Sequence, residues 1–350
     1  MDIKSLLKQV VAENSTDLII VADAPPMFRI SGELVQASKE VLTAEASREL
    51  IYNLLAPSQK ERFEREKELD VSYELPGIAR FRVNVHYQKG SVAAALRPIS
   101  EKIPSLEELN LPKAIAELAN EPRGLVLVTG PTGCGKTTTQ ACMIDIINSN
   151  RHAHIITIED PIEYLHHNRK SIVEQREVGI DTSSFATALR EALRQNPNVI
   201  LVGEMRDLET ISTAVTAAET GHLVISTLHT NDSVQAVDRI VDAFPPHSQQ
   251  QIRLQLSLTL QGVIAQQLLP RRDGKGLIPA VEILRATPAI RNIIRKAATA
   301  DIYSMMEIGA KYGMQTMDGA LKDLCQKGLL TKEEALSRAI NQENLSRLLG

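Results

Sequence analysis

A short glycine-rich segment constrains this chain more than any other feature. The apolar residues 124–128 are followed by Gly130-Pro131-Thr132-Gly133-Cys134-Gly135-Lys136-Thr137, and a helical pattern begins near Lys136. A buried strand, a glycine-rich turn and a Lys-Thr pair that opens a helix form the arrangement that a phosphate-binding loop requires. The sequence therefore predicts an α/β domain that binds a nucleoside triphosphate.

The residue types in this loop match the chemistry of phosphate binding. Glycine lets backbone N–H groups turn toward the phosphates, where the N-terminus of the helix adds partial positive charge. We expect Lys136 to reach the β- and γ-phosphates of ATP, and the Thr137 hydroxyl to bind Mg²⁺. The predicted nucleotide-binding residues are Gly130, Pro131, Thr132, Gly133, Cys134, Gly135, Lys136, Thr137 and Thr138. A strand-to-helix turn without a ligand is the less favoured interpretation, because every position of the motif is filled.

Composition excludes several classes of protein. A net charge of −4 argues against a broad basic face for nucleic acid, so neither a nucleic-acid partner nor a nucleic-acid motor is favoured. The three cysteines form no C-x-x-C pair, so neither zinc nor a disulfide framework is expected. The position of Cys134 at a helix N-terminus favours its thiolate, although a small residue that fits the turn is the simpler interpretation. Without a signal peptide or an uninterrupted apolar run of about 20 residues, the chain is expected to be cytoplasmic.

The pattern of elements changes along the chain. Residues 1–100 predict a small α+β domain with an antiparallel sheet, and residues 101–112 a linker rich in proline. From residue 113 to residue 286, short apolar strands alternate with amphipathic helices, which is typical of a parallel sheet with crossover helices. A helical region follows at residues 287–350. Within the second domain we expect core strands at 125–128, 154–158, 199–202 and 223–226, an edge strand at 171–174, a long helix at 249–268 and a strand at 276–283.

Polar residues follow each of the four core strands. The first strand leads to the glycine-rich loop, and the second to Glu159-Asp160-Pro161-Ile162-Glu163. The third leads to Gly203-Glu204-Met205-Arg206-Asp207, and the fourth to Ser226-Thr227-Leu228-His229. Ligands of parallel sheets bind beyond the carboxyl ends of the strands, so we expect these four segments to line one edge.

Three residues at this edge are predicted to be catalytic, namely Lys136, Glu163 and Glu204. Glu204 is expected to help to hold Mg²⁺, and Glu163 to act as a general base or to orient water. His229 is expected to sense the γ-phosphate by hydrogen bonding, with His222 as a more distant candidate. In isolation each would be interpreted as a solvated acid or a structural histidine, but the adjacent phosphate loop favours the functional role.

Positive charge to neutralise the γ-phosphate is expected from the first domain. The candidate arginine fingers are Arg80, Arg82 and Arg97, acting in the same chain or from a neighbouring subunit. Strand alternation places Arg80 and Arg82 on one face, opposite Phe81 and Val83. A solvated face of the sheet is an equally good interpretation of these arginines.

The motifs together resemble those of the secretion ATPase superfamily. GPTGCGKT is similar to its Walker A motif, ITIEDPIEY to its aspartate box, VILVGEMRD to its atypical Walker B motif and AETGHLVISTLHTN to its histidine box. Within the superfamily, the chain resembles the ATPases that retract type IV pili. Their C-terminal retraction motif is matched by Ala289, Ile290, Arg291, Asn292, Ile293, Ile294 and Arg295, with Ile293 and the following Lys296 in place of Leu and Glu. Assembly ATPases resemble it less, because they carry a tetracysteine zinc motif.

This resemblance implies a RecA-like ATPase core preceded by a PAS-like α+β domain and followed by a helical tail. It also implies a homohexamer that uses ATP and Mg²⁺ to drive pilus retraction and twitching motility. The expected partners are an inner-membrane platform protein of the pilus and a paralogous retraction ATPase, which would place the protein at the inner membrane at the pilus base. An accessory retraction ATPase, a secretion or assembly ATPase, and a nucleotide-binding regulator without turnover are the alternatives.

Overall fold

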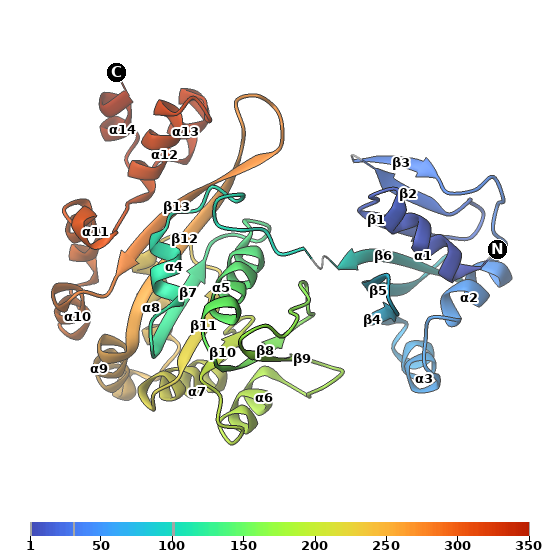
Figure 1. Ribbon diagram of the computed structural model, residues 1–350, viewed down its shortest axis with the longest axis horizontal. Helices are drawn as coiled ribbons and strands as arrows, with labels where there is room; N and C mark the ends of the chain where they lie inside the picture. Colours follow the sequence, from blue (N-terminus) through green and yellow to red (C-terminus); the bar gives the residue numbers. More distant parts are fainter. Residues whose placement is uncertain (1, 31, 100–101, 350) are drawn as a thin grey trace. The chain divides into compact units, whose positions relative to one another are not determined.

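The computed structural model of the chain describes residues 2–30, 32–99 and 102–349 (Figure 1). Contacts divide the chain into two units. The first comprises Met1–Lys102 with Pro161–Leu165, and the second comprises Ile103–Asp160 with His166–Gly350. The expected boundary between residues 100 and 101 lies outside the described residues.

The first unit is built on a six-stranded antiparallel sheet in the order β3-β2-β1-β6-β5-β4. Its strands are β1 (Asp17–Ile20), β2 (Met27–Ile30), β3 (Glu33–Gln36), β4 (Glu68–Leu75), β5 (Ala79–Gln88) and β6 (Ser91–Ile99). Its helices are α1 (Ile3–Ala12), α2 (Ala44–Tyr52) and α3 (Pro57–Glu66). Apolar side chains of the sheet and the helices form one core, with Phe63 and Phe81 fully buried. This antiparallel α+β unit agrees with the prediction for the N-terminal part.

The two faces of β5 differ as its sequence predicts. Phe81 and Val83 are fully buried in the core of the first unit. Arg80 and Arg82 occupy the alternate positions, where the side chains are partly or fully exposed. The predicted alternation is therefore confirmed, since successive side chains of a strand point to opposite faces.

The second unit contains a seven-stranded sheet in the order β13-β12-β7-β11-β10-β8-β9. Its strands are β7 (Gly124–Thr129), β8 (His154–Glu159), β9 (Ile172–Glu177), β10 (Val199–Val202), β11 (Leu223–Leu228), β12 (Leu260–Pro270) and β13 (Leu277–Arg285). All neighbouring strands pair in parallel except β12 and β13. The prediction of an α/β fold with a parallel sheet is confirmed, with β9 as its edge strand.

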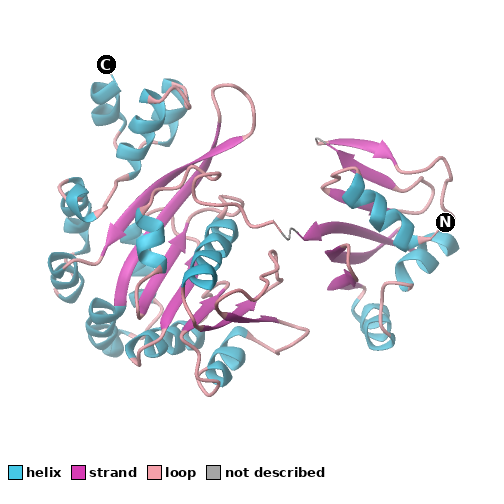
Figure 2. Ribbon diagram, viewed as in Figure 1, coloured by secondary structure: helices cyan, strands magenta, loops and turns pink. Residues whose placement is uncertain are grey.

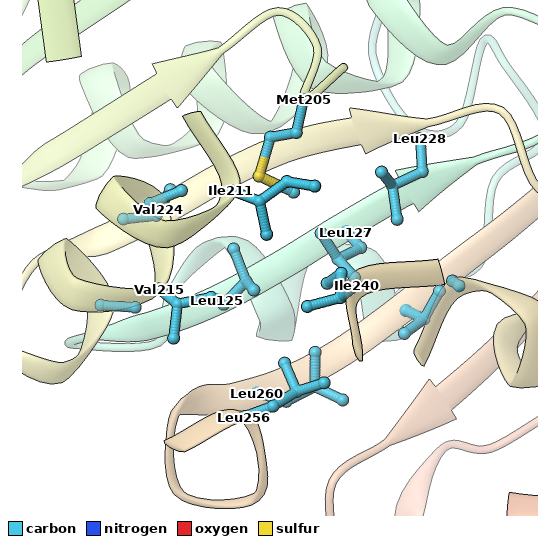
Figure 3. Close-up of a cluster of buried hydrophobic side chains, with 14 of the residues drawn as sticks. Leu125, Leu127, Met205, Ile211, Val215, Val224, Leu228, Ile240, Leu256 and Leu260 are labelled. Atoms are coloured by element: carbon cyan, nitrogen blue, oxygen red, sulfur yellow. The ribbon is translucent and has the colours of Figure 1, made fainter. Parts of the chain in front are cut away.

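Helices cover both faces of this sheet (Figure 2). One face packs against α4 (Ala114–Ala119) and α5 (Lys136–Asn150). The other face packs against α6 (Phe185–Ala192), α7 (Leu208–Glu219), α8 (Ser233–Asp242), α9 (Gln249–Thr259), α10 (Pro288–Arg295) and α11 (Ile302–Glu307). Leu125 and Leu127 of β7 point toward helices α6 to α11 (Figure 3), whereas Val126 and Val128 point toward α4 and α5. Burial on both sides explains why the strand is an unbroken apolar run.

The C-terminal region is helical, as predicted. Beyond α11 it contains α12 (Met317–Gln326), α13 (Lys332–Arg338) and α14 (Gln342–Leu349). Short 3₁₀ turns precede and follow α11, at η2 (Thr299–Asp301) and η3 (Ala310–Tyr312), and a third, η1 (Pro246–Ser248), lies between α8 and α9. The last three helices share a small apolar cluster with Leu269 of β12 and Ile278 of β13. No helix within the described ranges has the length and apolarity that a bilayer crossing requires.

The prediction of one long helix over residues 249–268 is wrong in its second half. Helix α9 ends at Thr259, and Leu260 begins a strand that pairs in parallel with β7. At Gly262 a β-carbon would lie 2.7 Å from both Leu118 Cδ2 and Leu284 O, so the close packing of β12 requires glycine there. A short buried apolar run has no clear period, and its neighbours in the sheet decide between helix and strand.

Candidate functional site

Four parallel strands end together at one edge of the sheet in the second unit. Thr129 of β7 pairs with Leu228 of β11, and Val202 of β10 pairs with Ile158 of β8 and Ser226 of β11. This register places Glu159, the last residue of β8, at the same edge as the glycine-rich loop, Glu204 and His229, which follow the ends of their strands. The prediction that these segments line one edge is confirmed for the residues that the second unit contains.

The glycine-rich loop joins β7 to α5 through positions that require glycine. Gly130 has a φ of 143°, and a β-carbon there would lie 2.3 Å from Gln266 O and 2.6 Å from Cys134 Sγ. Gly135, with a φ of 89°, is the residue before the helix. Since side chains are strained in this region of φ, only glycine allows the backbone to turn so tightly from strand to helix.

Lys136 is the first residue of α5 and is largely buried. Its Nζ donates hydrogen bonds to Gly130 O at 2.8 Å and to Pro131 O at 3.1 Å. These bonds hold the ammonium group against the first residues of the loop. A compact cation beside backbone N–H groups at a helix N-terminus is suited to bind the phosphates of a nucleotide.

Gln266 of β12 contacts the loop and was not predicted as a site residue. Its Nε2 donates to Cys134 O at 2.5 Å, and its Oε1 accepts from Thr139 Oγ1 at 2.9 Å. The side chain is buried, with 2% of its surface exposed. Its signal in the sequence is a glutamine inside an apolar run. The incorrect prediction of a helix over residues 249–268 gave no reason to place this glutamine near the loop.

The thiol of Cys134 is buried against the loop, with 3% of the residue exposed. Burial raises the pKa of this thiol, and the nearby Lys136 charge opposes that effect without cancelling it. The expectation that the helix N-terminus favours the thiolate is therefore wrong. Cys134 acts here as a small residue that fits the turn.

Glu204 follows β10 and lies between two cationic or ionisable side chains. Its Oε1 pairs with Arg206 Nη2 at 2.7 Å, and its Oε2 lies 3.4 Å from His229 Nε2. The Glu204 side chain is 12% exposed, whereas His229 and Arg206 are open to solvent. The structure thus brings together the predicted Glu204 and His229, and it adds Arg206, which the sequence analysis did not assign.

Gly203 follows β10 and lies close to the backbone of β8. A β-carbon at Gly203 would lie 3.2 Å from Ile158 O of β8. The Gly203 N–H donates to that same carbonyl at 2.8 Å, and Gly203 O accepts from Thr227 Oγ1 at 2.6 Å. A side chain at this position would therefore require a small shift of the β8 backbone.

His222 lies at the other end of β11. Its backbone oxygen accepts from the N–H of Gly124, the first residue of β7, at 2.9 Å. Its Nδ1 lies 2.9 Å from Ala217 O of α7. Within the second unit, the structure therefore does not bring His222 to the edge that holds the glycine-rich loop, because the whole length of β11 separates them.

The candidate arginine fingers and Glu163 belong to the first unit. Arg97 pairs with Asp17 at 2.8 Å, and Arg82 lies 3.7 Å from Asp70. Arg80 is on the same strand face as Arg82. Glu163 is exposed and lies in Pro161–Leu165, the short segment grouped with this unit. The catalytic roles of these four residues stay predictions.

The residues that resemble the C-terminal retraction motif lie in α10, which has two faces. Ile290 and Ile294 are buried in the core, whereas Ala289, Asn292 and Arg295 are exposed. Arg291 is half-buried and donates to Ser257 O and Leu258 O, each at 2.8 Å, and to Gln261 Oε1 at 3.0 Å. These two carbonyls lie in the last turn of α9, so Arg291 satisfies backbone groups that the end of a helix leaves without partners.

The donor set at the strand edge suits a hard cation that also binds phosphate. The described residues contain no group of three or more His, Cys, Asp or Glu side chains able to hold a metal by themselves. Mg²⁺ in nucleotide sites takes few protein ligands and completes its shell with phosphates and water. The Thr137 hydroxyl and the Glu204 carboxylate are oxygen donors of this kind.

Comparison with known proteins identifies similar chains. The family model described as "Type II/IV secretion system protein" matches residues 2–326. The type IV pilus retraction ATPase PilT of Pseudomonas aeruginosa is 46% identical over 344 residues, which cover 98% of this chain and 100% of that protein. The type IV pilus ATPase PilU of the same organism is 42% identical over 349 residues, which cover 100% of this chain and 91% of that protein. A crystal structure of the pilus retraction motor PilT with bound ADP matches with a TM-score of 0.93 at 46% identity, covering 99% of both chains.

Proposed function

Because the chain belongs to the family of type II/IV secretion system proteins, we propose that it is an ATPase that retracts type IV pili and so drives twitching motility. One observation carries this proposal. The glycine-rich loop, with Lys136 at the start of α5, lies at the same edge of the sheet as Glu204 and His229. The similarity to PilT over nearly the full length supports retraction as the purpose of ATP hydrolysis.

The chemistry follows from what these residues offer to ATP and water. The N–H groups of the loop and the Lys136 ammonium bind the phosphates, while His229 reports on the γ-phosphate through its contact with Glu204. The Thr137 hydroxyl and the Glu204 carboxylate hold Mg²⁺, which neutralises phosphate charge when it is bound. Glu163 orients the attacking water or accepts its proton.

The working assembly is a homohexamer that docks on an inner-membrane platform protein at the cytoplasmic side of the pilus base. In that assembly Arg80, Arg82 and Arg97 act as arginine fingers. Arg97 and Arg82 exchange their contacts with Asp17 and Asp70 for a nucleotide phosphate when they do so. The Arg82–Asp70 pair is exposed, and such a pair is worth about 0–1 kcal/mol, so breaking it costs little. The Asp17 side chain is only 14% exposed, but it keeps Arg29 at 3.6 Å when Arg97 leaves.

The test replaces the residue on which the proposal depends. Lys136→Ala removes the buried ammonium, and we expect phosphate release from MgATP to fall at least about a hundredfold. The same variant leaves a twitching bacterium non-motile when it replaces the native retraction ATPase. Lys170→Ala, which removes an exposed lysine of the same unit, is the matched control and keeps both activities. Normal phosphate release by Lys136→Ala, or none by the unmodified protein, would refute the proposal.

The similarity to PilU favours a second candidate, an accessory retraction ATPase that works beside a paralogue. Complementation separates the two functions. If the chain restores twitching to a strain that lacks its PilT, it is a retraction motor in its own right. If it restores twitching only to a strain that lacks its PilU, the accessory function is correct.

A further inference from the structure

We propose that Gln266 is a positioning residue, which orients the last peptide of the glycine-rich loop toward the phosphates of a bound nucleotide. The proposal rests on the proposed function, because it concerns the same nucleotide site. Gln266 lies on β12, one residue beyond the pair that Ala265 forms with Thr129 at the end of β7. From there its side chain reaches both the loop and the helix that follows it.

The first contact determines the direction of one peptide plane. The Gln266 amide N–H holds the carbonyl oxygen of Cys134 at 2.5 Å, on the side of β12. In a planar trans peptide, the C=O of one residue and the N–H of the next point in opposite directions. Fixing Cys134 O therefore fixes the N–H of Gly135 away from β12, as a donor for an anion that the loop encloses.

The second contact attaches the helix to the same side chain. The Gln266 amide oxygen accepts from Thr139 Oγ1 at 2.9 Å, and Thr139 is in the first turn of α5. One buried amide thus joins the loop peptide before Lys136 to the helix turn after it. The task needs a donor and an acceptor on one side chain, and glutamine supplies both at this length without depending on the pH.

The loop packs closely against β12 at Gln266. A β-carbon at Gly130 would lie 2.3 Å from Gln266 O, and one at Gly135 would lie 3.2 Å from Gln266 Nε2. Strand β12 therefore packs directly against the loop and limits its conformation. Replacing the Gln266 amide removes its hydrogen bonds to Cys134 and Thr139, whereas the close contact of the β12 backbone with Gly130 stays in place.

Binding of MgADP tests the proposal without requiring hydrolysis. Gln266→Met keeps the length and volume of the side chain but removes both polar ends. We expect the Kd for MgADP to rise about tenfold or more, the usual effect of losing one hydrogen bond to a charged group. Thr139→Val removes only the second contact and is expected to raise the Kd less, by about two- to tenfold. Gln267→Met, at the next position on the opposite face of the strand, is the matched control and leaves the Kd unchanged.

Gln266→Glu tests whether the hydrogen bond to Cys134 O, rather than the packing of the side chain, is responsible for the effect. A buried carboxyl has a raised pKa, and in its protonated form it donates to Cys134 O as the amide does. We therefore expect this variant to bind MgADP nearly as well as the unmodified protein at about pH 6, and to lose affinity toward about pH 9 as the carboxyl ionises. Gln266→Met is expected to bind equally weakly at both pH values.

The outcomes separate this proposal from the proposed function. An unchanged Kd in Gln266→Met, or a Kd of Gln266→Glu that follows the unmodified protein at every pH, would overturn the positioning role alone. Failure of the unmodified protein to bind MgADP would overturn the proposed function as well, and it would be visible before any variant is compared.

Discussion

Replacing Arg291 by alanine tests whether this residue of α10 stabilises the fold, in addition to lying in the segment that resembles the retraction motif. The guanidinium group donates to Ser257 O, Leu258 O and Gln261 Oε1, and burial lowers its pKa. Helix α9 stops at Thr259 because β12 begins at Leu260, which leaves those two carbonyls without helical partners. Arg291→Ala therefore removes the cap of the α9–β12 junction.

The magnitude follows from which of the three bonds are shielded from water. The bond to Leu258 O is exposed, so water replaces the guanidinium there at little cost. The bonds to Ser257 O and Gln261 Oε1 are partly buried, and each is worth about 1–1.5 kcal/mol. The expected loss in free energy of unfolding is thus about 2–3 kcal/mol, which lowers the Tm of a unit of this size by about 5–10 °C.

A thermal unfolding scan of the purified variant measures this loss. Arg295→Ala is the matched control, since Arg295 is an exposed arginine of the same helix and its loss is expected to move the Tm by no more than about 2 °C. If Arg291→Ala and Arg295→Ala unfold at the same temperature, the guanidinium does not hold the junction and the reasoning is refuted. A twitching defect of a stable Arg291→Ala protein would then have to come from the surface of α10.

Two further experiments examine the glycine-rich loop and the partly buried His166. Gly130→Ala places a β-carbon against Gln266 O, so urea unfolding is expected to show that the free energy of unfolding falls by about 2 kcal/mol or more. Gly133→Ala has open space around the new β-carbon and is expected to lose only about 1 kcal/mol. Equal losses in the two variants would contradict the crowding at Gly130. Burial lowers the pKa of His166 from 6.5 to about 4. Between these pH values the unfolded chain binds a proton at His166 that the folded protein does not, so the free energy of unfolding falls as the pH drops from about 6.5 toward 4. His166→Gln is expected to remove up to about 3 kcal/mol of that fall, and urea unfolding curves with the same pH dependence in both proteins would exclude the effect.

Much of the fold was predictable because its signals are local. The loop from Gly130 to Thr137 is continuous, and the backbone turn depends on glycines inside the segment itself. The apolar run before it is short and is flanked by glycines, which favours a strand buried on both faces, and the β7 side chains in the two cores agree. Likewise, Phe81 and Arg82 alternate along β5 because the period of a strand belongs to the backbone. Local steric rules act before any tertiary contact forms.

The rest depended on which elements lie side by side. Residues 260–268 carry no period that separates a strand from a helix, and pairing with β7 made them β12. That pairing alone brings Gln266 to the loop, 127 positions from Thr139, and the end of α9 gives Arg291 its partners. The contact of His229 with Glu204, 25 positions apart, likewise requires β10 and β11 to be neighbours. Sequence therefore determined the phosphate loop and its strand, whereas strand order decided what surrounds it, because hydrogen bonds between distant segments exist only once the sheet is assembled.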